Sequence, residues 1–270
     1  AGRSGRSALE VARACAREAG ELALQRFRQP QEVAVKGRGN FVSPTDLEIE
    51  SLIGQALASE FPNHGVLSEE TASETGLEGW VWVIDPLDGT HNFLSGIPFF
   101  CTNIALCHDG EPVVAVTHDP NHGESFWAER GRGAWVNDEP LHASKAEALR
   151  DAVFGIDLGY HDERGRALLQ LTHKLFPGVQ CVRLNGSAAL GLAYVAAGRY
   201  DVFLHQYLFP WDLAAGILLI REAGGAITDY TGGPVTLTTQ RVVAGGRDVR
   251  ADFLRWQQEH SAELDLLATA

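Results

Sequence analysis

The stretch Val81-Trp82-Val83-Ile84-Asp85-Pro86-Leu87-Asp88-Gly89-Thr90 joins four consecutive apolar residues to a loop with two acidic side chains. The apolar run is typical of a buried strand, and the proline and glycine after it are typical of a turn. Asp85 follows the strand directly and Asp88 is three positions further on, so both carboxylates face one side of the turn. Mg²⁺ prefers carboxylate oxygens and leaves coordination positions for water and substrate. The stretch therefore predicts a magnesium site, although the same letters also fit an ordinary surface turn.

Gly89 and Thr90 give the same loop a second predicted function. Gly89 permits a tight bend, and a helix that begins at Thr90 leaves the amides of both residues without partners inside the helix. Amides at a helix start bind anions, and Thr90 adds a hydroxyl group. We expect the backbone of these two residues to hold a phosphate group.

Three further acids are candidates for the same centre. Asp212 opens a helix predicted at 211–223, which is apolar on nearly every side and therefore lies between layers. Asp46 lies near the start of a helix that begins at about Ser43, and Glu69 follows a short apolar run. Each has a plainer alternative. Asp212 also fits a helix cap, Asp46 fits a capping box with Ser43, and Glu69 fits a solvated loop acid.

The hydrophobic pattern predicts alternating helices and strands without a repeat or an obvious linker. We expect two intimately packed subdomains that share one interface: residues 1–142, with the Asp-Pro-Leu-Asp-Gly-Thr loop, and residues 143–270, with Asp212. Lys36-Gly37-Arg38-Gly39-Asn40 is predicted to be a flexible basic loop. The predicted helices are 7–28, about 43–62, about 163–175, about 187–198 and 211–223. The predicted strands of the first half are 33–35 and 81–84, followed by an antiparallel meander at 102–108, 112–118 and 124–128. The predicted strands of the second half are 152–156 and 200–204.

The composition narrows the class of partner and the compartment. The 270 residues include 22 basic and 35 acidic side chains, and the formal charge of −13 disfavours nucleic acid or an anionic membrane surface as the main partner. No run approaches the roughly 20 apolar residues that span a bilayer. The four cysteines form no C-x-x-C pair and predict neither a disulfide framework nor a zinc site, so we expect a cytoplasmic protein.

Two other phosphatase chemistries do not fit the spacing of the candidate residues. Haloacid-type phosphatases carry a second aspartate two positions after the nucleophile, whereas Asp85 and Asp88 are three apart. No cysteine is followed by arginine six positions later, so the cysteine-phosphatase signature is missing as well.

Four blocks together resemble the inositol monophosphatase family. They are S-E-E at 68–70, V-I-D-P-L-D-G-T-H-N-F at 83–93, G-S-A-A at 186–189 and P-W-D-L-A-A-G at 210–216. Their order and spacing also match, and the resemblance covers about residues 8–245. It implies an α+β fold, the layered αβαβα sandwich of the sugar-phosphatase type. It also implies a lithium-sensitive, Mg²⁺-dependent phosphoric monoester hydrolase that acts on inositol-1-phosphate or a related polyol phosphate, as a homodimer.

The resemblance also implies roles for individual residues in binding two to three Mg²⁺ ions. Glu69, Asp85 and the backbone carbonyl of Leu87 would hold the first ion, and Asp85, Asp88 and Asp212 the second. A third, weaker ion would bind near Glu69.

The resemblance assigns the remaining roles to residues around this centre. Asp46 and Thr90 would orient and deprotonate the attacking water, and the amides of Gly89 and Thr90 would bind the phosphate. Small residues in the substrate-side loop would let the backbone approach a polyol. The substrate-side residues are Gly186, Ser187 and Ala188, and Lys36 matches a basic residue of the loop near the metals.

His205 is the main departure from the family pattern. The family's inositol-binding acid lies seven residues before the Trp-Asp aspartate, and this chain has His205 there. The exchange weakens the expectation of strict inositol specificity, and a histidine that touches no substrate is an equal alternative. Histidinol-phosphate and fructose-1,6-bisphosphate phosphatases share the metal set and are alternative activities. A transcription-associated interaction protein is the non-enzymatic alternative.

Overall fold

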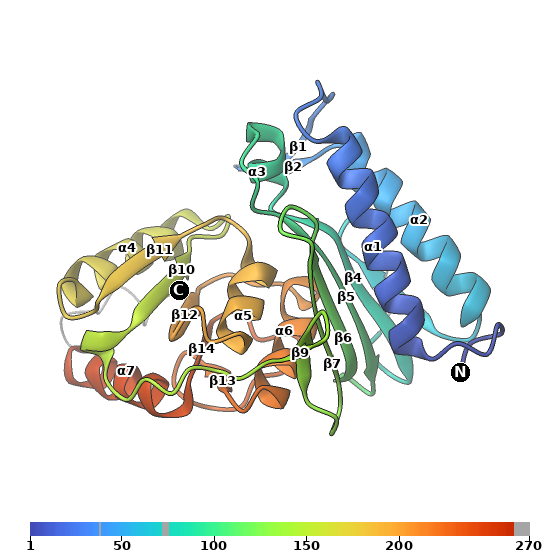
Figure 1. The fold of residues 1–270 in the computed structure, drawn as a ribbon. Coiled ribbons are helices and arrows are strands. Elements are labelled where there is room, and N and C mark those ends of the chain that lie inside the picture. Colours follow the sequence, from blue (N-terminus) through green and yellow to red (C-terminus); the bar gives the residue numbers. More distant parts are fainter. Residues whose placement is uncertain (38, 72–75, 262–270) are drawn as a thin grey trace.

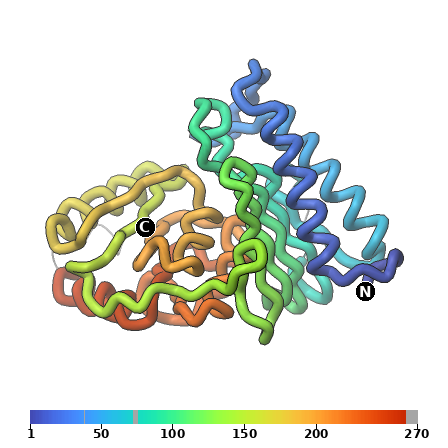
Figure 2. Tube along the Cα trace, in the orientation of Figure 1, coloured from blue at the N-terminus to red at the C-terminus, as the bar shows by residue number. Residues whose placement is uncertain are grey.

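The computed structural model describes residues 1–37, 39–71 and 76–261, which form five alternating layers of helices and sheets (Figure 1). A helix pair, a seven-stranded sheet, a second helix pair, a five-stranded sheet and a third helix pair follow one another. Figure 2 shows the amino-terminal half on the right and the carboxy-terminal half on the left. This order confirms the predicted α+β class and the αβαβα sandwich.

Helices α1 (Ala8–Arg26) and α2 (Pro44–Glu60) form the first layer. Ser7 and Glu10 make a reciprocal capping box at the start of α1. Pro44 occupies the first turn of α2, where its missing N–H group has no partner to lose. The buried faces of both helices join one apolar cluster with the larger sheet, so this layer covers the sheet's outer face.

The seven-stranded sheet has its strands in sequence order. Only the first pair is parallel, and the remaining pairs form an antiparallel meander. Both faces are covered by helices, which explains why the central strands are apolar on both sides. The strands are β3 (Gly65–Ser68), β4 (Trp80–Asp88), β5 (Cys101–His108), β6 (Glu111–Asp119), β7 (Glu124–Glu129), β8 (Ala134–Val136) and β9 (Glu139–Pro140).

The five-stranded sheet has the order β11-β10-β12-β14-β13 and mixes parallel and antiparallel pairs. Helices α4 (Asp162–Leu175) and α7 (Arg247–Glu259) pack on its outer face. Helices α5 (Ala188–Ala196) and α6 (Pro210–Glu222) lie between the two sheets. The strands are β10 (Val153–Asp157), β11 (Cys181–Leu184), β12 (Val202–His205), β13 (Ala226–Asp229) and β14 (Val242–Gly245), and a short 3-10 helix, η1 (Leu149–Asp151), precedes β10.

The middle helices, α5 and α6, pack against both sheets. One apolar cluster contains buried residues of the larger sheet, of α5 and α6, and of the smaller sheet. The two sheets therefore share one apolar core, and the expectation of two subdomains stays a prediction. The division at residue 142 lies between β9 and η1 and stays a prediction.

The course of β4 corrects one prediction. The strand continues through Pro86 to Asp88 and does not end before a turn. Asp85 and Asp88 both pair with β5, with a register shift between them. Pro86 has no N–H group for a regular ladder, and an irregular strand accommodates it. The predicted Asp-Pro-Leu-Asp-Gly-Thr loop is therefore the irregular end of β4 followed by the short helix α3 (Thr90–Ser95).

The predicted basic loop at 36–40 is a second correction. Strands β1 (Ala34–Gly37) and β2 (Asn40–Val42) pair as an antiparallel hairpin that takes in most of this segment. Gly39 has a φ of +70°, which allows the tight turn between the strands. Arg38 lies outside the described residues. The glycines that predicted a loop thus belong to a short hairpin.

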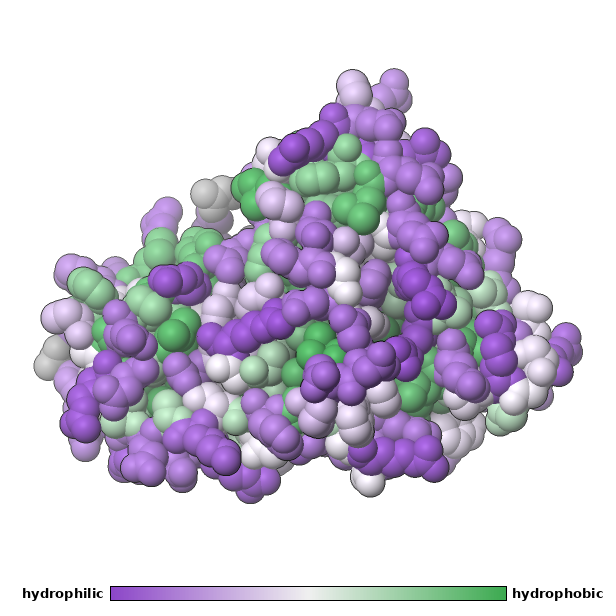
Figure 3. Space-filling model, viewed as in Figure 1, coloured by the Kyte–Doolittle hydropathy of each residue, from purple (hydrophilic) through white to green (hydrophobic). Residues whose placement is uncertain are grey.

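The face of the molecule drawn in Figure 3 is mostly hydrophilic, with smaller hydrophobic groups between the hydrophilic residues. Within the described ranges, no helix has the length and apolar character needed to cross a bilayer.

Candidate metal centre

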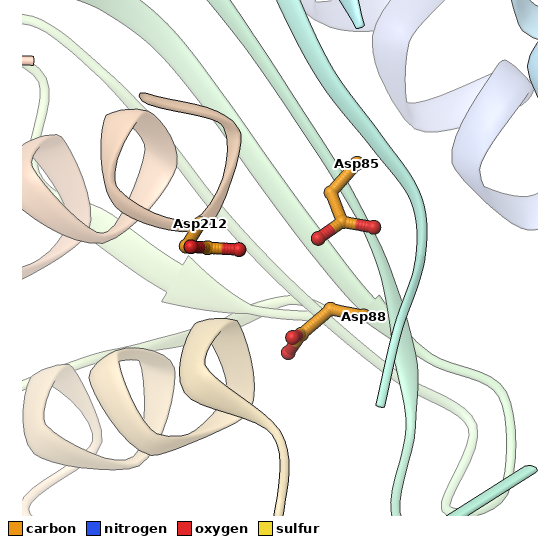
Figure 4. Close-up of side chains that lie close together, drawn as sticks. All are labelled: Asp85, Asp88 and Asp212. Carbon is orange, nitrogen blue, oxygen red and sulfur yellow. The ribbon is translucent and has the colours of Figure 1, made fainter. Parts of the chain in front are cut away.

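Asp85, Asp88 and Asp212 converge on one point between the halves of the molecule (Figure 4). Asp85 and Asp88 come from the irregular end of β4, and Asp212 comes from the first turn of α6. One carboxylate oxygen from each residue can be chosen so that all three lie within 4.8 Å of one another. Three carboxylates at this spacing form the kind of oxygen donor set that a hard divalent cation prefers.

Burial makes the charged form of these carboxylates unfavourable in free energy unless a cation is bound. Burial raises the pKa of all three carboxyl groups, and neighbouring carboxylates raise the pKa of Asp85 and Asp212 further. Among the described residues, none of the three forms an ion pair with a basic side chain. Buried carboxylates need a proton, a cation or strong hydrogen bonds to offset their lost hydration. The donor set therefore fits Mg²⁺.

Backbone and hydroxyl donors hold each carboxylate by one oxygen. The amide of Leu87 donates to Asp85 Oδ1 at 3.1 Å, and the amide of Phe209 donates to Asp212 Oδ2 at 2.7 Å. These contacts fix the side chains and leave the other oxygen of each group for an ion. Asp212 thus makes the cap-like contact of the plainer alternative and also takes part in the cluster.

The start of α5 holds the third carboxylate. The amide of Ala189 donates to Asp88 Oδ2 at 2.9 Å, and the hydroxyl of Ser187 donates to the same oxygen. The amide of Ala188 also donates to the Asp88 carboxylate, and this hydrogen bond opposes the rise in pKa that burial causes. The hydroxyl of Ser187 therefore faces a candidate metal ligand and not the open cavity, and the substrate loop is tied directly to the centre.

The predicted catalytic pair is brought together. Thr90 Oγ1 lies 2.9 Å from Asp46 Oδ1 and 2.9 Å from the carbonyl oxygen of Leu87. Asp46 also accepts the amide of Ser43 at 2.8 Å, so the capping-box alternative holds at the same time. Burial raises the pKa of the Asp46 carboxyl. Because a hydroxyl has one hydrogen, Thr90 can donate to only one of its two acceptors at a time.

Glu69 and Lys36 form a neighbouring group outside the three-carboxylate cluster. Lys36 Nζ lies 3.3 Å from Glu69 Oε1 and 2.6 Å from Glu70 Oε1. Burial is the main cause that raises the pKa of Glu69 to about 7, and Lys36 opposes it. The negative charge of Glu69 is also a cause of the raised pKa of Asp85, and a metal-binding role for Glu69 stays a prediction.

Gly89 and Gly186 bring two loops into close contact. Both have positive φ angles, +91° and +77°. A Cβ atom on Gly89 would lie 3.0 Å from the carbonyl oxygen of Phe99, and one on Gly186 would lie 3.1 Å from Asn92. Larger residues are therefore disfavoured at both positions. Asn92 Nδ2 donates to the carbonyl oxygen of Asn185 at 2.7 Å and clamps the substrate loop to α3.

A cavity of about 950 Å³ opens beside the centre. Asp46, Thr90, Glu69, Asp85 and Lys36 are not among the residues that line it. Of the residues predicted to contact metal or substrate, those that line it are Asp88, Gly89, Gly186, Ala188, His205 and Asp212.

His205 is a buried, uncharged histidine at the end of β12 on the cavity wall. It is 3% exposed, and burial lowers its pKa to about 3. Its Nδ1 accepts the amide of Tyr207 at 3.0 Å, which assigns the ring hydrogen to Nε2. An imidazole in this form donates one hydrogen bond where an acid would accept one.

Asp157 is a cavity residue that the sequence reasoning missed. It ends β10 and pairs in register with His205 on β12. Burial raises its pKa to about 7, although the amide of Leu158 donates to it at 2.8 Å. Asp157 ends the mainly apolar strand Val153–Asp157, and the same pattern of an apolar strand followed by aspartate had indicated Asp85 as a site residue.

The raised pKa of Asp157 predicts a pH-dependent effect of Asp157→Asn on stability. The folded state retains this proton up to about pH 7, whereas the unfolded chain loses it near 3.8, so wild-type stability falls as pH rises through that interval. The asparagine variant has no carboxyl group at this position, so its stability does not fall in this way. In chelator, the unfolding temperature of the variant minus that of the wild type should increase between pH 5 and pH 8, by an amount equivalent to as much as about 3 kcal/mol. A difference that stays constant over this range would contradict the assignment.

The model of the inositol monophosphatase family matches residues 6–263, and the chain belongs to this family. It is 41% identical over 243 residues to the inositol-1-monophosphatase of Rhizobium meliloti, covering 89% of each chain. It is 39% identical over 261 residues to the Nus factor SuhB of Escherichia coli strain K12, covering 95% of this chain and 98% of that one. The solved structure of extragenic suppressor protein suhB from Bartonella henselae matches with a TM-score of 0.86 at 38% identity, covering 91% of this chain and 96% of that one. Family membership supports a phosphatase.

Proposed function

We propose that this protein hydrolyses a small phosphate monoester with Mg²⁺ at the Asp85–Asp88–Asp212 centre. The observation that carries the proposal is the convergence of these three carboxylates, two buried and one half-buried, at distances suited to a cation. A cation resolves the electrostatic cost of burying them together. The inositol monophosphatase family supports the same reaction class.

One group of residues would hold the ions, and a second group would support the reaction. Glu69, Asp85 and the Leu87 carbonyl would hold one ion, Asp85, Asp88 and Asp212 a second, and Glu69 a weaker third. When bound, Mg²⁺ lowers the pKa of a coordinated water and neutralises charge on the phosphoryl and leaving oxygens. The carboxylates supply the negative charge that retains the ions, and their hydrogen bonds to the backbone keep them in place.

Asp46 and Thr90 would manage the proton of the attacking water. Asp46 accepts the hydrogen of Thr90, which turns the lone pairs of the threonine oxygen toward an incoming water. As the water oxygen attacks phosphorus, its proton would pass to Thr90 Oγ1 while the Thr90 hydrogen passes to Asp46. The bond between phosphorus and the alcohol oxygen breaks, and the alcohol oxygen takes up a proton from solvent water. Burial strengthens Asp46 as a base by raising the pKa of its carboxyl.

The amides at the start of α3 would hold the phosphate, and the loop at 186–188 would border the alcohol. Gly89 and Gly186 line the cavity and have no side chain to obstruct it. Family resemblance makes inositol-1-phosphate or a related polyol phosphate the first candidate for the substrate. Histidinol phosphate and fructose-1,6-bisphosphate are alternative substrates for the same centre.

Phosphate release with and without Mg²⁺ tests the reaction class. We expect release from p-nitrophenyl phosphate in Mg²⁺, loss of release in chelator, and inhibition by lithium. A competitive panel of inositol-1-phosphate, histidinol phosphate, fructose-1,6-bisphosphate and adenosine 3′,5′-bisphosphate then ranks the substrates by kcat/KM. Equal release with Mg²⁺ and with chelator would contradict the proposal.

The relatives named Nus factor SuhB favour a second candidate role, as a transcription-associated interaction protein. The net charge of −13 directs that role toward protein partners and away from direct nucleic-acid binding. We propose a homodimer for either role, in line with the family expectation. An interaction that persists in an inactive Asp88→Asn variant would separate the second role from catalysis.

A further inference from the structure

Asn103 connects the two elements that carry the candidate metal ligands. It lies on β5, directly opposite Asp85 in the ladder with β4. Its Nδ2 donates to the carbonyl oxygen of Trp211 at 2.6 Å, and Trp211 directly precedes Asp212 in the first turn of α6. One buried side chain therefore joins the sheet that carries Asp85 to the helix that carries Asp212.

Thr117 fixes the direction in which the amide group of Asn103 points. It lies opposite Asn103 on the neighbouring strand β6, and its Oγ1 donates to Asn103 Oδ1 at 2.6 Å. The reversed amide would place its oxygen against the carbonyl oxygen of Trp211, where two acceptors repel each other. The amide nitrogen is therefore held toward α6. A continuous chain of hydrogen bonds runs from β6 through β5 to the first turn of the helix.

These polar groups lie inside an apolar core. Asn103 is 1% exposed and Thr117 is 0% exposed. Buried residues of β5 and α6 around them belong to the apolar cluster that the two sheets share. A leucine and a valine in their place would also pack the helix on the sheet. What the hydrogen-bonded pair adds is a fixed position of the Trp211 carbonyl, and with it of Asp212, relative to β5.

We propose that Asn103 and Thr117 are positioning residues that hold Asp212 at metal-binding distance from Asp85. The proposal rests on the phosphatase function above and adds the residues that set the geometry of its metal centre. Ligand oxygens of Asp85, Asp88 and Asp212 lie within 4.8 Å of one another, and repulsion between their charges favours a wider spacing. The contact from Asn103 is made one residue before Asp212 and opposes that separation.

The double variant Asn103→Leu/Thr117→Val tests this role. Leucine and valine are close in size and shape to the residues that they replace, so the variant loses both hydrogen bonds and leaves neither partner of the pair unsatisfied. Its affinity for Mn²⁺, measured from the electron paramagnetic resonance signal of free Mn²⁺, should fall about 10- to 100-fold, the usual effect of removing a partner that orients metal ligands. Half-maximal phosphate release should require correspondingly more Mg²⁺, and saturating Mg²⁺ should restore most of the wild-type kcat.

Thr117→Ser and Thr172→Val are the matched controls. Serine keeps the hydroxyl group, so Thr117→Ser should retain the wild-type Mn²⁺ affinity. Thr172 donates its hydroxyl to the carbonyl oxygen of Leu168 at 2.7 Å within α4, on the outer face of the smaller sheet. Thr172→Val therefore removes a comparable hydrogen bond away from the centre, and its Mn²⁺ affinity should equal that of the wild type. Should the double variant fail to fold, Thr117→Val replaces it, because it frees the amide of Asn103 to turn.

Metal binding and turnover separate this inference from the phosphatase proposal. Equal Mn²⁺ affinity in the wild type and the double variant, with Mg²⁺-dependent phosphate release by both, would overturn the positioning role and leave the phosphatase proposal intact. A lower unfolding temperature in chelator with unchanged Mn²⁺ affinity would also overturn it, because the pair would then serve only to pack α6 on the sheet. Weaker Mn²⁺ binding by the variant of a protein that hydrolyses no ester would support the positioning role and overturn the phosphatase proposal.

Discussion

Asp88→Asn is expected to reduce kcat/KM for any accepted phosphate ester by a factor on the order of 10³ or more in Mg²⁺. The substitution removes one of the three charges that converge on the centre. It keeps the shape of the side chain, and an asparagine oxygen can still accept the hydrogen bonds from Ser187 and Ala189. Phosphate release at several Mg²⁺ concentrations measures the loss, and calorimetric titration of Mg²⁺ should show weaker binding.

The same substitution should leave the fold intact. Burial raises the pKa of Asp88, so an uncharged amide removes an electrostatic cost in the metal-free protein. We expect an unfolding temperature in chelator equal to or above that of the wild type. Asp151→Asn is a control for the loss of one surface charge, because this side chain is 65% exposed. Turnover of Asp88→Asn near the wild-type rate would place the metal elsewhere.

Asp46→Asn is expected to lower kcat by roughly 10²- to 10⁴-fold, the usual range for loss of a general base. Mg²⁺ affinity should change little, because Asp46 lies outside the three-carboxylate cluster. Thr90→Val tests the other half of the pair, since valine has the shape of threonine without its hydroxyl. If Asp46 and Thr90 act as one unit, the double variant should be hardly slower than the worse single variant.

A purely structural role for Asp46 makes a different prediction. Loss of the capping box at the start of α2 would cost about 1 kcal/mol of stability and leave kcat unchanged. Thermal unfolding and single-turnover rates on both single variants distinguish the two roles. A normal kcat with a lowered unfolding temperature would refute the proposed proton transfer.

Much of the fold was predictable because local signals and packing agree. The apolar run before Asp85 predicted β4, and the proline near Ser43 predicted the start of α2. The helix with Asp212 was predicted to lie between layers because it is apolar on nearly every side, and α6 does lie between the two sheets. That position is what brings Asp212 to β4.

The remaining features depend on tertiary contacts that leave no local pattern. The register shift at Pro86 is set by pairing with β5, and the hydroxyl of Ser187 turns to Asp88 because α5 packs against the end of β4. Tyr207 lies between β12 and α6, where no periodicity reveals that its ring meets that of His161 at the start of α4. Asp157, by contrast, could have been predicted from the sequence, because it ends an apolar run in the way that Asp85 follows one.

Anomalous diffraction from a crystal soaked with Mn²⁺ and inorganic phosphate would locate the ions themselves, with Mn²⁺ standing in for Mg²⁺. We predict an anomalous peak among the carboxylate oxygens of Asp85, Asp88 and Asp212, and a tetrahedral anion beside the amides of Gly89 and Thr90. A protein that binds Mn²⁺ in solution and shows its anomalous peaks only away from these three carboxylates would contradict the proposed metal centre.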